Sequence, residues 1–176
     1  MKIAVIGGGV GGTSFLHELV SENAHDLDIQ VDLYDQGRGL GGRASHRIVK
    51  EERNEFRFDH GCQFFRADTH TMQQLVAELK QRGAVKEWKG AFKAKKTDST
   101  DETSDETFDF FGMPDRGPYY VGGEEGGGIN DLPLALAAMA QEKGLKNGVK
   151  VNIHPGTRVS KLVQISSGKW RLEGVG

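Results

Sequence analysis

Hydrophobic and polar positions divide the first 35 residues into three segments. Residues 3–6 form a continuous apolar run, which is typical of a strand buried on both faces. Apolar side chains then recur at helical spacing up to Val20, and a later segment alternates between apolar and polar until Asp35. This order predicts a βαβ crossover, because that connection buries a continuous apolar strand economically. We therefore expect a parallel pair of strands at 2–6 and 29–35, flanking a helix from about Gly11 to Glu22.

The same patterns predict further elements along the chain. Residues 69–82 carry apolar side chains at i, i+3, i+4 and i+7, which indicates an amphipathic helix that Gly83 ends. A second helix follows Asn130 or Asp131, either of which can cap it, and we expect it to end at Gly144. The other apolar runs predict strands: a hairpin of 45–50 and 55–58, a short strand at 85–88, edge strands at 108–111 and 118–121, and strands at 149–153, 158–165 and 169–172.

An acidic, polar stretch interrupts this series at residues 94–107. It contains one apolar residue and cannot bury enough surface to order itself, so we expect a disordered or loosely held insertion. The chain then divides into three parts: an N-terminal βαβ unit at 1–50, a second part at 51–121 that holds the insertion, and a return to the first domain at 122–176.

Composition narrows the classes of function. The 176 residues carry 23 lysines and arginines against 25 aspartates and glutamates, a formal charge of −2, which favours neither a nucleic-acid nor a membrane-surface partner. Cys62 is the only cysteine, which excludes an internal disulfide and favours a reducing compartment. The six histidines show no metal-ligand spacing, so we expect no metal site. Nothing in the sequence indicates an oligomeric state.

Targeting and membrane segments are not expected either. No apolar run approaches the ~20 residues of a membrane span. The first strand begins at Lys2, which leaves no room for a signal peptide, so we expect a cytoplasmic protein.

Glycine is about twice as frequent as usual, and one cluster has a spacing with chemical meaning. Gly7, Gly9 and Gly12 fit the motif G-x-G-x-x-G between the first strand and the first helix. Gly7 permits the tight turn, the missing side chain of Gly9 lets a pyrophosphate approach the backbone, and Gly12 lets the helix pack close to the strand. The helix N-terminus then offers free N–H groups and its positive dipole end to phosphates. The motif predicts a dinucleotide site; the alternative is a glycine-rich turn without a ligand.

Two features after the second strand extend this site. Asp35 follows Gly12 by 23 residues, near the spacing at which a Rossmann unit places a carboxylate on a ribose diol, and it would repel a 2′-phosphate. Gly41 and Gly42 let the main chain lie flat against a ligand, and the guanidinium of Arg43 can bind a phosphate in bidentate fashion. The alternatives are an ordinary strand-ending aspartate and a flexible surface turn.

A glycine run at 122–128 precedes the later helix and is open to two interpretations. It predicts either a second anion site at the helix N-terminus or a flexible loop. Glu124 and Glu125 argue against a phosphate there.

These segments together resemble the flavin-dependent amine oxidase superfamily, and within it the renalase-like branch. The likeness rests on the glycine motif, Asp35 and the Gly41-Gly42-Arg43 sequence. Residues 58–65, Phe-Asp-His-Gly-Cys-Gln-Phe-Phe, sharpen it, because they are similar to the branch's F-D-x-G-A-Q-Y/F-F segment. The resemblance implies an α/β, Rossmann-like FAD-binding fold with a parallel sheet and an additional β-rich segment.

The resemblance implies FAD as the cofactor. The glycine motif would hold the pyrophosphate, Asp35 the adenosine ribose, Arg43 the phosphates and the backbone of Val159 the adenine end, while residues 59–63 would lie near the flavin ring. No catalytic residue is identified. The implied cofactor-binding residues are Gly7, Gly9, Val10, Gly11, Gly12, Asp35, Gln36, Gly42, Arg43, Gly61, Cys62, Gln63 and Val159.

The chain departs from the branch at three places. Cys62 replaces the usual alanine. It is either a small buried residue or a thiol beside the flavin. Residues 126–130, Gly-Gly-Gly-Ile-Asn, stand where the branch tends to have Gly-Met-Asn. Family members continue for well over a hundred residues beyond the point that matches Gly176, so we expect a fold that is incomplete at its C-terminus.

Two classes of function follow from the sequence. The first is an FAD-dependent oxidoreductase of the renalase or amine oxidase type, which takes hydride from a small reduced substrate and passes electrons to oxygen. The second is a dinucleotide-binding module, partial or without turnover. A yellow colour after purification would separate them.

Overall fold

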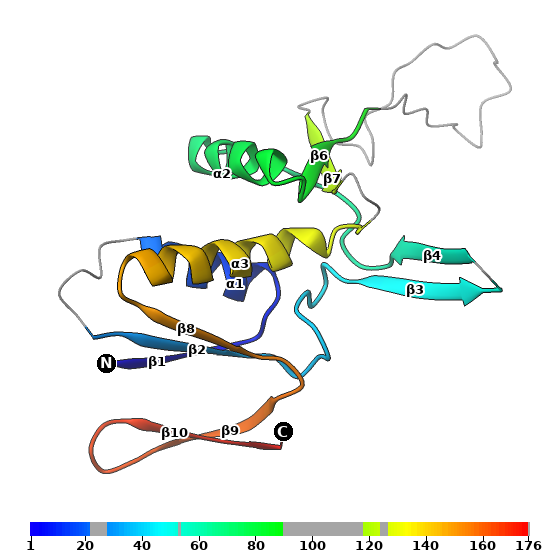
Figure 1. Cartoon of the computed structure of the whole chain (residues 1–176). Coiled ribbons are helices and arrows are strands. Elements are labelled where there is room, and N and C mark those ends of the chain that lie inside the picture. The colour runs from blue at the N-terminus through cyan, green and yellow to red at the C-terminus, as the bar shows by residue number, and fades with distance from the viewer. Residues whose placement is uncertain (22–27, 53, 90–117, 124–126, 176) are drawn as a thin grey trace, which may run out of the picture.

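The structure is a computed structural model that describes residues 1–21, 28–52, 54–89, 118–123 and 127–175 (Figure 1). Three helices are present in these residues: α1 (Val10–Ser21), α2 (His70–Gln81) and α3 (Asp131–Lys146). The strands are β1 (Lys2–Ile6), β2 (Gln30–Tyr34), β3 (His46–Glu51), β4 (Asn54–Asp59), β5 (Phe65–Arg66), β6 (Val85–Glu87), β7 (Tyr119–Gly122), β8 (Lys150–His154), β9 (Arg158–Gln164) and β10 (Trp170–Val175).

A parallel sheet with helices on one face forms the centre of the molecule. Its order is β1-β2-β8, and both pairings are parallel, with Ile3 opposite Val31 and Val31 opposite Val151. Helices α1 and α3 lie against each other on one face, and the β9–β10 hairpin lies on the other side (Figure 1). The predicted βαβ unit is confirmed, and the fold is Rossmann-like, mixed α/β, with additional antiparallel strands.

Two hydrophobic cores meet at α3. The first lies between the parallel sheet and the helices; it includes Leu16, Val20, Val31, Leu33, Ala137 and Ala140. The second joins α3 to α2, β6 and β7; it includes Val76, Leu79, Val85, Leu132, Leu136 and Met139. Because α3 contributes residues to both cores, it fixes the β5–β7–β6 sheet and α2 relative to the parallel sheet.

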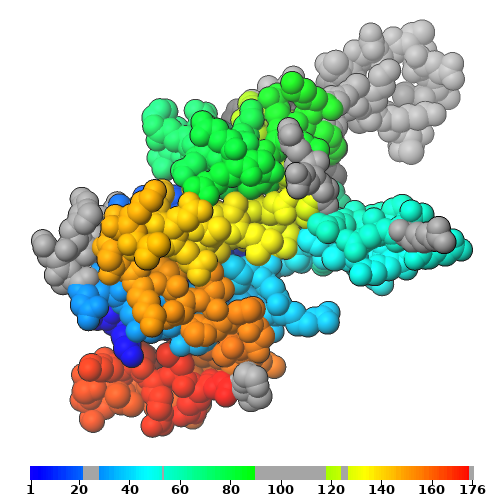
Figure 2. Space-filling view, in the orientation of Figure 1, coloured from blue at the N-terminus to red at the C-terminus, as the bar shows by residue number. Residues whose placement is uncertain are grey.

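The antiparallel strands lie outside this centre. Strands β3 and β4 form the predicted hairpin, which projects from the side of the molecule (Figure 2) and exposes Ile48, Phe56 and Phe58. Strand β7 lies between β5 and β6, so the expectation that residues 118–121 form an edge strand is wrong. Strand β5 was not predicted, because two residues are too few to show a periodic pattern.

The ends of the two later helices depend on glycine in different ways. Gly83 follows α2 with a φ of 69°, as predicted for a helix stop. Gly144 does not end α3, which continues to Lys146 and is followed by Gly148 with a φ of 73°. A Cβ on Gly144 would lie 2.8 Å from Val151 Cγ2 and 2.9 Å from the Val149 carbonyl oxygen. Gly144 therefore permits close packing of α3 on β8.

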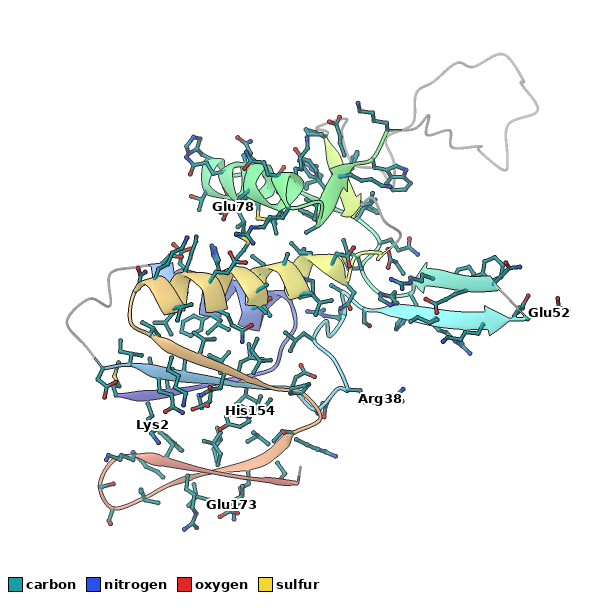
Figure 3. The ribbon with its side chains drawn as sticks, in the orientation of Figure 1. Lys2, Arg38, Glu52, Glu78, His154 and Glu173 are labelled. Atoms are coloured by element: carbon teal, nitrogen blue, oxygen red, sulfur yellow. The ribbon has the colours of Figure 1, made fainter. Side chains whose placement is uncertain are left out.

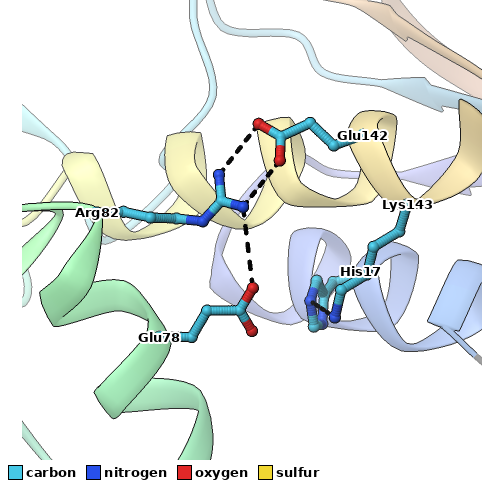
Figure 4. Close-up of polar contacts among 5 residues, drawn as sticks. All are labelled: His17, Glu78, Arg82, Glu142 and Lys143. Carbon is cyan, nitrogen blue, oxygen red and sulfur yellow. Dashed lines mark hydrogen bonds and ion pairs between the residues drawn. The ribbon is translucent and has the colours of Figure 1, made fainter. Parts of the chain in front are cut away.

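A polar cluster lies where α1, α2 and α3 meet (Figure 4). The ammonium of Lys143 contacts Nε2 of the buried His17 at 2.8 Å, and burial, followed by the charge of Lys143, lowers the pKa of His17. Arg82 makes two bonds to Glu142, at 3.0 and 2.8 Å, and lies 3.9 Å from Glu78. The cluster links α2 to α3 and holds His17 in its neutral form.

Some expectations concern residues outside the described part of the chain: the end of the first helix at Glu22, the insertion at 94–107 and the strand at 108–111. Within the described part, none of the helices combines the length and the apolar character needed to cross a membrane.

Candidate functional site

A cavity of about 560 Å³ opens at the carboxyl ends of β1 and β2. In open α/β sheets this edge is where ligands bind, and the volume is in the range of small-molecule sites. Six of the residues that the sequence analysis singled out line it: Gly7, Gly9, Asp35, Gln36, Gly42 and Val159.

The glycines of the motif divide into those that the fold requires and one that it does not. Gly7 has a φ of 100°, and a Cβ on Gly12 would overlap the carbonyl oxygen of Gly7. A Cβ on Gly8 would overlap Cδ2 at the end of the Leu40 side chain, which would have to shift. A Cβ on Gly9 would meet no protein atom closer than 3.6 Å, an ordinary contact. A Cβ on Gly9 would therefore fit in ordinary contact with the backbone of Gly41 and Gly42, so packing within the chain does not require a glycine at this position of the cavity wall.

The N-terminus of α1 begins at the same place. The first bond of the helix runs from the Thr13 N–H to the Gly9 carbonyl at 3.0 Å, so Val10, Gly11 and Gly12 begin the helix with N–H groups that have no helical acceptor. The first turn contains no acidic side chain that would neutralise the positive end of the dipole. This end of α1 suits an anion.

Asp35 connects the two loops that form the cavity. Its carboxylate accepts the Gly8 N–H and the Gly37 N–H, each at 2.6 Å. Each carboxylate oxygen has two lone pairs, so both can accept a second bond from a diol. The Asp35 side chain therefore fixes the glycine loop and also faces the space beside it.

The Gly41–Ala44 turn lies against the glycine loop. The Gly41 N–H donates to the Gly8 carbonyl at 2.9 Å, and Gly41 forms an isolated bridge with Gly9. Gly42, with a φ of 58°, lines the cavity. The turn closes on itself through the Ala44 N–H and the Gly41 carbonyl, at 2.9 Å. It thus forms a second wall of the cavity, as its position after Asp35 predicted.

Seven predicted site residues do not line this cavity: Val10, Gly11 and Gly12 at the start of α1, and Arg43, Gly61, Cys62 and Gln63. The side chain of Arg43 is exposed, while its carbonyl accepts the Cys62 N–H at 2.8 Å. A Cβ on Gly61 would overlap the same carbonyl, so residues 61–63 lie against the turn from another side. Gln63 Nε2 reaches the Asp59 carbonyl at 3.4 Å, and Cys62 Sγ lies 3.2 Å from the Phe64 carbonyl. Burial raises the pKa of the Cys62 thiol, which disfavours a reactive thiolate.

Several residues that line the cavity were missed. Ile6 and Tyr34 end their parallel strands on the face opposite the helices, a position that strand alternation after Val5 and Leu33 could have indicated. Thr157 and Arg158 arrive from the start of β9, where the Thr157 N–H donates to the Asp35 carbonyl at 2.8 Å. That long-range pairing leaves no local signal in the sequence. The other missed lining residues are Gly37, Gly39, Leu40 and Ser45.

A polar cluster supports Tyr34 in the cavity wall. The ring of Tyr34 stacks on His154, with 4.7 Å between centroids. Figure 3 labels His154, which lies between the parallel sheet and the β9–β10 hairpin. His154 Nε2 lies 3.0 Å from Asp32 Oδ1, which also accepts the Asn152 amide at 2.8 Å. Burial acts to raise the pKa of Asp32, but the hydrogen bonds from His154, Asn152 and Gln30 outweigh it and lower that pKa. Asp32 is therefore an anion that orients His154 beneath Tyr34.

The glycine run before α3 does not form a second anion site in the described residues. The Asp59 carboxylate accepts the Ile129 N–H, at 3.0 and 3.1 Å, and so occupies the position that an anion would take. Asn130 precedes the helix but makes no capping bond with its side chain. Burial raises the pKa of Asp131 in the first turn, although the Gly123 N–H opposes this. No group of three metal-ligating side chains is found in the described ranges.

Residues 5–79 match the family described as NAD(P)-binding Rossmann-like domain. This range contains the end of β1, the whole of α1 and β2, and the Gly41–Ala44 turn. Among solved structures, the crystal structure of Thermovibrio ammonificans THI4 is similar, with 13% identity and a TM-score of 0.37. The match covers 97% of this chain and 45% of that one, so this chain spans less than half the length of that protein. A likeness at this level says nothing about activity.

Proposed function

We propose that this chain binds a dinucleotide, FAD, in the cavity at the carboxyl ends of β1 and β2. The observation that carries the proposal is Gly9, because it lines the cavity and the protein's own packing does not require a glycine there. The match of residues 5–79 to an NAD(P)-binding Rossmann-like family supports a dinucleotide of some kind.

The residues present fit such a ligand from the pyrophosphate to the adenine. The N–H groups of Val10, Gly11 and Gly12 and the backbone of Gly42 would receive the pyrophosphate. Asp35 would accept hydrogen bonds from the adenosine ribose, and its charge disfavours a 2′-phosphate. Gln36 and Val159 line the same space and would meet the adenosine end.

The flavin end of the site is supported by less of the described chain. Arg43 and residues 61–63 lie next to the Gly41–Ala44 turn, outside the cavity. We propose that residues 61–63 approach the flavin ring and that the exposed Arg43 side chain reaches the phosphates. We also keep the division into parts at 1–50, 51–121 and 122–176 as a proposal.

The finer proposal is an FAD-dependent oxidoreductase of the amine oxidase superfamily, renalase-like, that oxidises a small reduced substrate with oxygen as the acceptor. Bound flavin would supply hydride acceptance. The chain's own residues would bind the cofactor, fix its pyrophosphate through α1 and keep its ribose diol on Asp35.

The alternative is a dinucleotide-binding module without turnover. Anaerobic mixing of the FAD-loaded protein with dihydropyridine nucleotides separates the two, since bleaching of the flavin absorbance supports the enzyme and its persistence supports the module.

The binding test is a titration of the purified protein with FAD and with NAD⁺, followed by flavin fluorescence and calorimetry. We expect FAD to bind more tightly, with competition by ADP-ribose. Gly9→Glu should weaken binding by at least about a hundredfold, because a carboxylate would face the pyrophosphate and like charges cost several kcal/mol.

Gln74→Glu is the matched control, since it adds the same charge on an exposed position of α2, which does not line the cavity. It should leave binding unchanged, and both variants should keep the circular dichroism of the native chain. Native-like FAD affinity in Gly9→Glu would contradict the site. Tighter binding of NAD⁺ than of FAD would contradict the choice of cofactor.

A further inference from the structure

The side chain of Asn130 bridges two distant parts of the chain. Its Nδ2 atom donates to the Leu40 carbonyl at 2.7 Å and to the Ala44 carbonyl at 3.1 Å, across 90 and 86 residues. Both amide hydrogens are therefore used on one turn of the backbone. A residue at this position usually caps its helix, and Asn130 does not.

The two carbonyls flank the turn that forms a wall of the cavity. Leu40 and Ala44 lie on either side of Gly41 and Gly42, and Gly42 lines the cavity. A Cβ on Gly41 would overlap Asn130 Nδ2, so the amide is packed directly against the turn. The other side of the turn is bonded to the glycine loop through the Gly41 N–H and the Gly8 carbonyl.

Asn130 is itself held by a rigid element. The Asp59 carboxylate accepts the N–H of the neighbouring Ile129, which fixes the chain just before α3. Leu132 and Leu136, in the first turns of α3, are buried in the second core. The amide of Asn130 therefore extends from a fixed point to a turn rich in glycine, which has few conformational restraints of its own.

We propose that Asn130 is a positioning residue for dinucleotide binding. Its amide fixes the Gly41–Ala44 turn against the glycine loop, and this places the backbone of Gly42 for the pyrophosphate. The ligand in this inference rests on the proposed function. The hydrogen bonds from Asn130 to the turn are independent of that function.

The test compares two ligands in two variants. Asn130→Asp keeps the shape of the side chain and removes both donors, and Asn130→Ala removes them without adding charge. We expect the affinity for ADP-ribose to fall about tenfold, the effect of losing a hydrogen bond or two, while the affinity for adenosine, which has no phosphate, changes less than about twofold. Asn147→Asp is the matched control, because Asn147 donates to the Val20 carbonyl at the other end of α3, and both affinities should be retained.

Amide hydrogen exchange in the ligand-free protein gives a second readout. The N–H groups of Gly41 and Ala44 should exchange at least about tenfold faster in both Asn130 variants, while those of α1 and β2 stay as in the native chain. An equal loss of ADP-ribose and adenosine affinity, or unchanged exchange in the turn, would overturn the proposal. If the native protein binds no dinucleotide, the proposed function fails, and the exchange of the turn alone decides whether Asn130 positions it.

Discussion

At the scale of single residues, the motif glycines have different physical causes. Gly7 and Gly12 are required by backbone geometry within the chain, whereas Gly9 has room for a Cβ and lines the cavity. Gly11 is exposed on α1, and a Cβ there would have no heavy atom within 4 Å. One spacing pattern thus combines glycines needed for folding with one suited to a ligand.

This distinction predicts opposite results for the same substitution at adjacent positions. Gly11→Ala should stabilise the protein by about 0.5–1 kcal/mol, because alanine restricts the unfolded chain and favours helix. Gly12→Ala should destabilise it by about 1–3 kcal/mol, because the new methyl group overlaps the Gly7 carbonyl and forces α1 away from β1. Urea unfolding of both variants measures this. Equal free energies of unfolding for the two variants would show that the glycine loop adjusts freely to a methyl group at Gly12.

Local patterns predicted the site residues within the first βαβ unit, whereas Val159 was predicted only through the family resemblance. The spacing of Gly7, Gly9 and Gly12 and the distance to Asp35 identified one wall of the cavity, because both lie within one βαβ unit. Thr157 and Arg158 were missed, since they reach the cavity through pairing between segments more than 100 residues apart. The role of Asn130 was missed for the same reason: a capping asparagine and a bridging one look alike in sequence.

At the scale of elements, hydrophobic periodicity predicted α1, α2 and α3. It did not predict the features that depend on how these elements pack together. Gly144 looked like a stop, but it lies at the contact of α3 with β8. Residues 118–121 looked like an edge strand because their partners, β5 and β6, are very short. Helix α3 has no single apolar stripe, since it is buried on two sides.

The two faces of α3 should respond separately to mutation. Met139 is fully buried in the second core, so Met139→Ala should cost about 2–5 kcal/mol. Native-state hydrogen exchange should then accelerate in α2 and β6 more than in β2. Leu145→Ala is the control, because Leu145 lies on the same helix with 84% of its surface exposed, and it should change stability by less than about 0.5 kcal/mol. Equal acceleration in β2 would mean that the two cores open as one unit.

At the scale of the whole molecule, the junction of α1, α2 and α3 makes stability depend on pH. His17 faces Lys143 and Arg82, which disfavour its protonation, and Glu18 and Glu78, which favour it; burial is the largest influence, and the pKa lies below its ordinary value of 6.5. A histidine with a lowered pKa binds fewer protons in the folded state than in the unfolded state. Its contribution to stability is therefore complete above about pH 6.5 and is lost as the pH falls toward the pKa of the folded state.

The measurement is the free energy of unfolding between pH 7.5 and pH 5, compared with that of His17→Gln. The native protein should lose more stability on acidification than the variant, with an additional slope of up to about 1.4 kcal/mol per pH unit. The difference between the two proteins removes the contributions of the other titrating groups. Parallel curves would show that His17 titrates as it does in the unfolded chain.

The position of β8 has a consequence for the order of folding. Residues of β1, α1 and β2 are neighbours in sequence, but Val31 pairs with Val151 across 120 residues, and the chain between them builds the second core. Contacts between residues so far apart in sequence slow folding, because the chain loses the entropy of loop closure before the contacts contribute any favourable free energy. In pulsed hydrogen exchange during refolding, the Gln30 N–H, bonded to Met1, should be protected before the Asp35 N–H, bonded to His154. Simultaneous protection of the two amides would mean that the sheet forms in one step. Until β8 joins, the open edge of β2 leaves the newly folded βαβ unit prone to association with other chains.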